Sequence, residues 1–325
     1  MAKSAALTHL PLPGPRALAK ESWEIYKKRV FTIAGIAVVQ FLLSFAILLV
    51  GVVIGVILFF ALGGKPTTPI FVIGGILFLI VFVAELYLSI WFLPSYSITY
   101  RDWQKPSGMI EIIKASRAYM RATIMTGVIS VILVLGALFA FFLPGIVFRI
   151  WFMFWIFVVI IDNRQGLLAL HTSREYVRGR FWQVVGRVIV VHIPEIVLSL
   201  LIGGMGKDAM GGGGGVSMQL ISLALMPFYG AYMYSLFMHL KKSRGEVPAH
   251  IPQASKRKYI GVAALGYVLL IVGAIFVVPL VVPLVENLMK QRTQESTTTT
   301  TPPPYYEPGQ QMPSSYPIPS GSSEI

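Results

Sequence analysis

The hydrophobic and polar positions of this chain alternate on the scale of whole membrane-spanning segments. Apolar runs near or above the roughly 20 residues that cross hydrocarbon as a helix are separated by polar gaps. Seven such runs predict an all-α fold, a polytopic transmembrane helical bundle of about seven spans. The runs are 31–62, 70–96, 122–143, 145–161, 181–202, 216–240 and 259–284.

Two of the predicted spans have unusual lengths. The first is over-long and rich in glycine, which favours a tilt or a kink. The fourth is short, and the sequence Leu143-Pro144-Gly145 predicts a tight turn between it and the third span.

Lysine and arginine fall mainly in alternate gaps between the apolar runs. Of the 27 basic residues, 22 lie before the first run, in the gaps 101–121 and 241–258, or in the range 164–187, whose last residue, Arg187, lies in the first turns of the fifth run. Because positively charged loops stay cytoplasmic, we expect a cell-membrane protein with a cytoplasmic N-terminus. Seven spans then place the C-terminal tail outside. The first thirty residues show no cleavable signal peptide, so we expect the first span to direct insertion.

Basic, amphipathic stretches precede the first, third and fifth spans, at residues 17–28, 110–121 and 167–178. Aligning Tyr26, Tyr119 and Tyr176 also aligns a basic residue two positions later in each stretch. We interpret them as interfacial helices that open three tandem helical-hairpin units, followed by one extra span. The alternative is that any helix entering a membrane carries tyrosine and cations at headgroup depth.

The predicted organisation has five parts. Residues 1–30 form a cytoplasmic amphipathic segment, 31–240 a six-span membrane domain, 241–258 a basic cytoplasmic linker and 259–288 the seventh helix. Residues 289–325 are rich in Thr, Pro and Tyr, and we expect them to be disordered. The glycine-rich segment 203–216 predicts a flexible outer loop.

Composition narrows the class of protein. Apolar residues make up 55% of the 325 residues and charged residues only 13%, which excludes an ordinary water-soluble domain. The net charge of +13 lies beside apolar runs, so it favours a membrane surface and no nucleic acid. The absence of cysteine excludes disulfides and thiolate sites.

The segment 143–182 carries a resemblance to a known family. A Pro-Gly turn is followed by an aromatic-rich span, then by Asp162-Asn163-Arg164-Gln165-Gly166 and by Ser173-Arg174-Glu175-Tyr176-Val177-Arg178-Gly179-Arg180-Phe181-Trp182. This pattern resembles the membrane domain of the glycerophosphoryl diester phosphodiesterase family and related uncharacterised prokaryotic membrane proteins. Arg174 replaces the tryptophan that usually follows the serine. The resemblance implies a membrane-embedded helical domain, without the family's separate catalytic domain.

The same residues have physical roles that do not depend on the resemblance. Asp162 or Asn163 can cap the amphipathic helix that follows. Gly179 permits a bend into the next span. Phe181 and Trp182 suit the aromatic belt at the membrane interface.

Ionisable residues inside apolar runs are the default functional clue in a membrane protein, because an unpaired charge there costs a few kcal/mol. Glu85 and Arg149 lie in the second and fourth runs. A mutual ion pair would neutralise both. The alternatives are a substrate or proton path through Glu85, and a Glu85 that is protonated.

His192 and Glu195 share one helical face, with Pro194 between them. An interhelical hydrogen-bond cluster is the leading interpretation, ahead of a proton-coupled or ion-coupled site and of a metal site. One histidine and one carboxylate are too few ligands to predict a metal. No nucleophile–base pattern or phosphate-binding loop is present, so we expect no cofactor and a protein that is not an enzyme.

Basic residues at the predicted cytoplasmic surface are candidates for binding anionic lipid headgroups, at about 1 kcal/mol each. The candidates are Arg121, Arg174, Arg178, Arg180, Lys241 and Lys242. The leading hypothesis is a non-enzymatic protein in lipid or small-molecule handling, or a partner-binding module that uses its tail or amphipathic helices. The alternative is a proton- or ion-coupled secondary transporter whose cavity is lined by Glu85, Arg149, His192 and Glu195.

Overall fold

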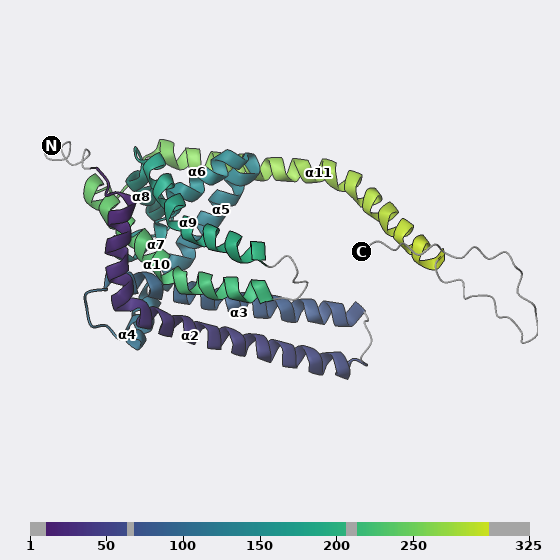
Figure 1. Ribbon diagram of the computed structural model, residues 1–325. Helices are drawn as coiled ribbons and strands as arrows, with labels where there is room; N and C mark the ends of the chain where they lie inside the picture. The colour runs from purple at the N-terminus through teal and green to yellow at the C-terminus, as the bar shows by residue number, and fades with distance from the viewer. Residues whose placement is uncertain (1–10, 64–67, 206–212, 299–325) are drawn as a thin grey trace, which may run out of the picture. The chain divides into compact units, whose positions relative to one another are not determined.

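The computed structural model describes residues 11–63, 68–205 and 213–298, and every regular element within them is helical (Figure 1). The predicted all-α class is thereby confirmed. The helices are α2 (Pro15–Ala61), α3 (Thr68–Arg101), α4 (Met109–Ser116), the 3-10 turn η2 (Arg117–Tyr119), α5 (Met120–Ala140), α6 (Phe142–Phe152), α7 (Trp155–Ile161), α8 (Leu167–Val177), α9 (Phe181–Met205), α10 (Gly213–Arg244) and α11 (Gln253–Thr298).

Five of these segments are long and apolar enough to cross a membrane, judged over the described residues. They are Pro15–Ala61, Thr68–Arg101, Met109–Ala140, Phe142–Ile161 and Gln253–Phe276. The expected fifth and sixth spans coincide with α9 and α10, whose side chains are only partly described. A multi-pass helical membrane protein is therefore supported, and the count of seven spans stays a prediction.

Several predicted boundaries shift. The interfacial stretch 17–28 is not a separate helix, because α2 runs from Pro15 to Ala61 without interruption; Figure 1 shows this helix as two limbs that meet at a bend. The turn expected at Leu143–Gly145 is also wrong. The chain turns at Phe141, whose backbone is extended, and Pro144 lies in the first turn of α6. Proline is tolerated there because the first helical N–H groups have no partner within the helix.

The predicted cap of the amphipathic helix is wrong as well. Asp162 ends α7, while α8 begins after Gly166. Gly166 has a positive φ of 61°, a conformation that glycine adopts at little cost. The expected bend at Gly179 is confirmed in part. Its positive φ of 82° interrupts the helical conformation between α8 and α9.

Contacts divide the chain into two compact units, Met1–Leu269 and Leu270–Ile325, with the boundary inside α11. The five-part organisation predicted from the sequence stays a prediction. Helix α11 continues to Thr298. The rest of the tail and the centre of the glycine-rich loop lie outside the described residues.

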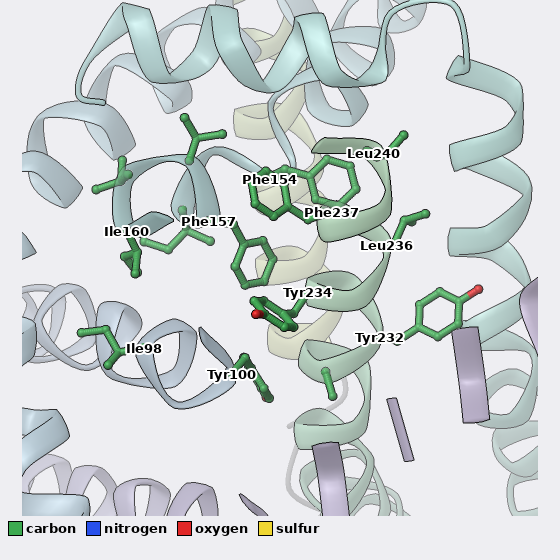
Figure 2. Close-up of a cluster of buried hydrophobic side chains, with 14 of the residues drawn as sticks. Ile98, Tyr100, Phe154, Phe157, Ile160, Tyr232, Tyr234, Leu236, Phe237 and Leu240 are labelled. Carbon is green, nitrogen blue, oxygen red and sulfur yellow. The ribbon is translucent and has the colours of Figure 1, made fainter. Parts of the chain in front are cut away.

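The core of the first unit is aromatic and lies where α3, α7 and α10 meet. Figure 2 shows Phe154, which caps the start of α7, and Phe157 of α7 facing Phe237 and Tyr234 of α10, with Tyr100 of α3 beside them. Phe237 lies with its ring centroid 5.6 Å from Phe157 and 6.0 Å from Phe154. Burying large aromatic rings in this way removes much apolar surface and fixes the helices through ring geometry.

Helix α11 packs on α5 through small residues. A Cβ atom placed on Gly266 would overlap the carbonyl oxygen of Gly136, and one on Gly136 would lie 2.7 Å from the backbone of Ala263. The Tyr267 hydroxyl donates to the Ile132 carbonyl across the same contact, at 3.1 Å. Small residues let two membrane helices approach this closely, which strengthens their packing.

Candidate functional site

The basic segments predicted to be cytoplasmic meet at one end of the first unit, which we call the cationic end. Arg29 is buried in α2 and donates to the carbonyl oxygens of Asp102 (2.5 Å), Lys105 and Ser107 (3.0 Å). It thereby ties the first basic segment to the loop between α3 and α4. Each hydrogen bond from a charged donor of this kind is stronger than a neutral one.

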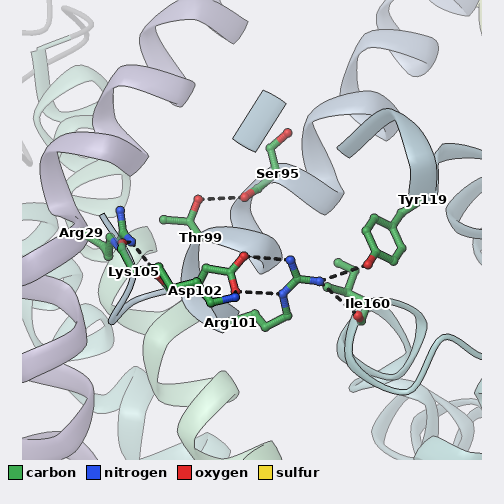
Figure 3. Close-up of polar contacts among 8 residues, drawn as sticks. All are labelled: Arg29, Ser95, Thr99, Arg101, Asp102, Lys105, Tyr119 and Ile160. Atoms are coloured by element: carbon green, nitrogen blue, oxygen red, sulfur yellow. Dashed lines mark hydrogen bonds and ion pairs between the residues drawn. The ribbon is translucent and has the colours of Figure 1, made fainter. Parts of the chain in front are cut away.

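Arg101 extends this network to the next segments (Figure 3). Its guanidinium pairs with Asp102 at 2.8 Å and donates to the Tyr119 hydroxyl at 3.0 Å, and it also reaches the Ile160 carbonyl. The Arg101 guanidinium lowers the pKa of the Asp102 carboxyl, which keeps the pair charged.

Asp162 connects the segments around 162–178 and 241–258. It accepts hydrogen bonds from the Tyr176 hydroxyl at 2.9 Å and from the Lys241 ammonium. Arg164 donates to the carbonyl oxygens of Val247 and Pro248. Because Asp162 lies two residues from Ile160, the neighbourhoods of Tyr119 and Tyr176 are at the same end of the bundle, as the charge pattern predicts.

One carboxylate at this end faces three guanidinium groups. Glu175 lies 3.2 Å from Arg244, 3.4 Å from Arg178 and 3.8 Å from Arg174. We call these four residues the Glu175 cluster. The exposed fraction of the side chain falls from 64% for Arg178 to 35% for Arg244, 20% for Arg174 and 12% for Glu175. The cluster therefore runs from an open rim to a nearly buried carboxylate.

Arg174 is the most constrained cation of the cluster. Its guanidinium lies over Trp151 and Tyr259, 4.6 and 5.6 Å from the ring centroids, and donates to the Tyr259 hydroxyl at 3.1 Å. His171 Nδ1 lies 3.0 Å from the same hydroxyl. Burial lowers the pKa of His171, so the neutral imidazole is favoured beside the arginine. Arg174 Nε is buried and has no hydrogen-bond partner.

The structure separates the six predicted headgroup residues into three groups. Arg174 and Arg178 belong to the Glu175 cluster. Arg180 donates to Ser243 at 2.8 Å, and Lys241 pairs with Asp162. Arg121 and Lys242 are exposed.

Sequence reasoning missed Tyr259 and His171 as members of this region, and it did not pair Arg244 with Glu175. The pair Glu175 and Arg178 has helical i, i+3 spacing and could have been identified. Arg244 could not, because it is 69 positions from Glu175 and reaches it only through the packing of α10 on α8.

The predicted ion pair between Glu85 and Arg149 is wrong. Glu85 instead accepts a hydrogen bond from the Ser44 hydroxyl of α2, at 2.8 Å, and its second oxygen is buried without a hydrogen-bond partner. Arg149 lies exposed on α6. The pairing fails because α3 packs mainly on α2, which brings Ser44 to Glu85.

His192 and Glu195 do interact, as their spacing predicts, with Nδ1 and Oε2 3.4 Å apart. The His192 ring lies against Tyr229 of α10, with 4.8 Å between centroids. Glu85, Arg149 and His192 thus have separate surroundings and do not form one polar cluster. Among the described residues, no group of three or more His, Asp or Glu side chains is arranged to hold a metal ion.

Comparison of the chain with models of protein families, with curated proteins and with solved structures gave no match. The resemblance to the phosphodiesterase membrane domain therefore rests on the motif residues of segment 143–182 alone.

Proposed function

We propose that this chain is a non-enzymatic multi-pass protein of the cell membrane that holds anionic lipid headgroups at its cationic end. The observation that carries the proposal is the Glu175 cluster, in which three arginines surround one carboxylate. The Glu175 carboxylate neutralises only one of the three guanidinium groups, so the cluster has a net positive charge. Anionic headgroups are the anions that a membrane supplies at this depth.

The surroundings of the cluster suit a headgroup. Arg178 is the most exposed of its cations, and Trp182 at the start of α9 is 80% exposed. Exposed tryptophan beside arginine is typical of the membrane interface. The proposal includes a cytoplasmic location for this end, seven spans built from three helical-hairpin units and one extra helix, and a relation to the phosphodiesterase membrane domain without its catalysis.

The alternative function, a proton- or ion-coupled transporter, is supported by the contact between His192 and Glu195. A coupled site normally gathers its ionisable groups around one pathway. Because Glu85 and Arg149 have other surroundings, we favour lipid binding.

The test is retention of lipid by the purified protein. The chain is extracted from membranes that contain anionic and zwitterionic lipids, and the bound lipid is measured by mass spectrometry. We expect the Arg178→Gln and Arg244→Gln double variant to retain several-fold less anionic lipid. Each cation near the surface contributes about 1 kcal/mol to such binding.

Lys105→Gln is the matched control. It removes one exposed cation at the same end, but Lys105 pairs with Asp102 and not with Glu175. Arg178→Gln alone provides a variant whose side chain is mostly exposed, so its fold should be unaffected. Unchanged anionic-lipid retention in a folded double variant, or an equal loss in Lys105→Gln, would overturn the proposal.

A further inference from the structure

The Glu175 cluster has a charge excess that distinguishes one class of anion from another. Three guanidinium groups and one carboxylate leave two positive charges. Among the neighbouring groups, Lys241 pairs with Asp162, and burial lowers the pKa of His171, which favours its neutral form. Arg180, which lies near Arg244, adds further positive potential and so also favours an anion. An anion that carries close to two negative charges would balance the cluster.

We infer that the Glu175 cluster is a phosphomonoester site, which deepens and rests on the proposed function. A phosphomonoester carries about −1.5 to −2 charges at neutral pH and presents three acceptor oxygens. A phosphodiester headgroup carries a single negative charge, so one positive charge would remain unbalanced.

The geometry supports a ligand rather than a purely structural role. Guanidinium groups that all contact one carboxylate lie close enough to repel one another, and this repulsion is stronger at a partly buried site than in water. A dianion bound at the rim would relieve the repulsion. Arginine also matches phosphate oxygens through two parallel N–H donors, so two or three arginines can coordinate the three oxygens of a phosphomonoester.

The two less exposed cations, Arg174 and Arg244, are preorganised to bind phosphate oxygens. Stacking against Trp151 and the hydrogen bond to Tyr259 hold Arg174 in place. Its Nε donor is buried without a hydrogen-bond partner, an unfavourable state that an acceptor would relieve. Arg244 is fixed by its ion pair with Glu175, while the exposed Arg178 can swing towards a ligand.

Two sources could supply this chemistry, a phosphomonoester lipid such as phosphatidic acid or free phosphate. The experiment places the full chain in vesicles or nanodiscs that contain either phosphatidic acid or phosphatidylglycerol, matched in surface charge. Retained lipid is measured by mass spectrometry. A parallel arm follows the melting temperature in detergent with inorganic phosphate, against sodium chloride of equal ionic strength.

We expect phosphatidic acid to be retained about tenfold over phosphatidylglycerol, which corresponds to about 1.4 kcal/mol. Arg178→Gln should lower this preference, and Lys105→Gln should leave it unchanged. A rise in melting temperature with inorganic phosphate that Arg178→Gln removes would also support the site and would identify soluble phosphate as a second source.

The two proposals fail in different ways. If both anionic lipids are retained equally and Arg178→Gln lowers both, lipid binding stands and the phosphomonoester inference is wrong. If Arg178→Gln alters the retention of neither lipid, both are wrong. Arg178 is 64% exposed, so an effect of this variant cannot be assigned to loss of the core.

Discussion

The cationic end and the apolar hairpin are held together by different forces. The apolar hairpin comprises residues 37–61 of α2 and 68–87 of α3, and none of these residues is buried. The most apolar window of each helix contains no buried residue. At the cationic end, by contrast, Arg29 alone joins α2 to three carbonyl oxygens of a distant loop.

The difference follows from the solvent that surrounds each region. Lipid chains are as apolar as leucine, so burying hydrophobic surface does not drive the two hairpin helices together within a bilayer. Within the hairpin, the Ser44 hydroxyl donates to Glu85, and beyond it the Tyr96 hydroxyl of α3 donates to Gln40 of α2, each at 2.8 Å. The cationic end has a buried aromatic core and charge-assisted hydrogen bonds. We therefore expect substitutions there to have larger effects than matched substitutions in the hairpin.

The largest effect should come from Arg29→Ala. This change removes one buried cation and leaves the carbonyl oxygens of the α3–α4 loop without their donor. Hydrogen bonds to charged groups are worth about 1.5–3 kcal/mol each, so we expect a loss of at least about 2 kcal/mol. The measurement is the melting temperature in nanodiscs, together with protease sensitivity of residues 102–107.

Lys27→Ala is the control for this prediction. Lys27 belongs to the same segment, but its ion pair with Glu24 is half exposed, and such pairs contribute little. Equal melting temperatures for the two variants would show that the buried hydrogen bonds of Arg29 do not hold the cationic end.

Replacing a glycine by alanine at each of two helix contacts compares the packing of α11 on α5 with the packing inside the hairpin. In Gly266→Ala, the new Cβ meets the rigid backbone of Gly136, so we expect a loss of about 1–3 kcal/mol from overpacking. In Gly51→Ala, the new Cβ lies 2.7 Å from a Val81 methyl group, and that side chain can rotate away. Melting temperatures of both variants in the same nanodiscs give the comparison. A hairpin variant as unstable as Gly266→Ala would contradict the proposed difference.

The smallest expected effect is a dependence of the protein's stability on pH, caused by His171 at the cationic end. Burial lowers the pKa of His171 in the folded chain below its usual value of 6.5, so the unfolded chain binds the proton more readily. The stability contributed by neutral His171 is therefore complete above that value and is lost as pH falls below it. We expect the melting temperature to fall as the pH is lowered below about 6.5, and to fall less in His171→Asn. An identical pH dependence in the variant would exclude His171 as the group responsible.

Much of the fold could be predicted from local pattern. The lengths of the apolar runs predicted the long helices, and the spacing of His192 and Glu195 predicted their contact. The turn at Phe141 and the start of α8 after Gly166 were missed. Both features depend on the backbone geometry of a single residue. The nearby Pro144 and Asp162 instead predicted a turn and a helix cap at the wrong positions.

The partner of each intramembrane charge could not be predicted. Glu85 lies opposite Ser44 rather than Arg149 because of how α2 and α3 pack, and packing depends on the whole surface of both helices. The Glu175 cluster is a similar case, since α8 supplies Arg174 and Glu175, Arg178 directly follows α8, and α10 supplies Arg244.

The sequence by itself determined which segments are apolar enough to span a membrane and which basic segments gather at one end. A bilayer fixes the length of a spanning helix and opposes the transfer of cationic loops across it. Both constraints can be recognised in the composition of short stretches of the chain. Only the tertiary structure decided which cations converge on Glu175 and which carbonyl oxygens Arg29 meets. Contacts between residues about 70 positions apart depend on the fit of side chains across helices, which no local pattern contains.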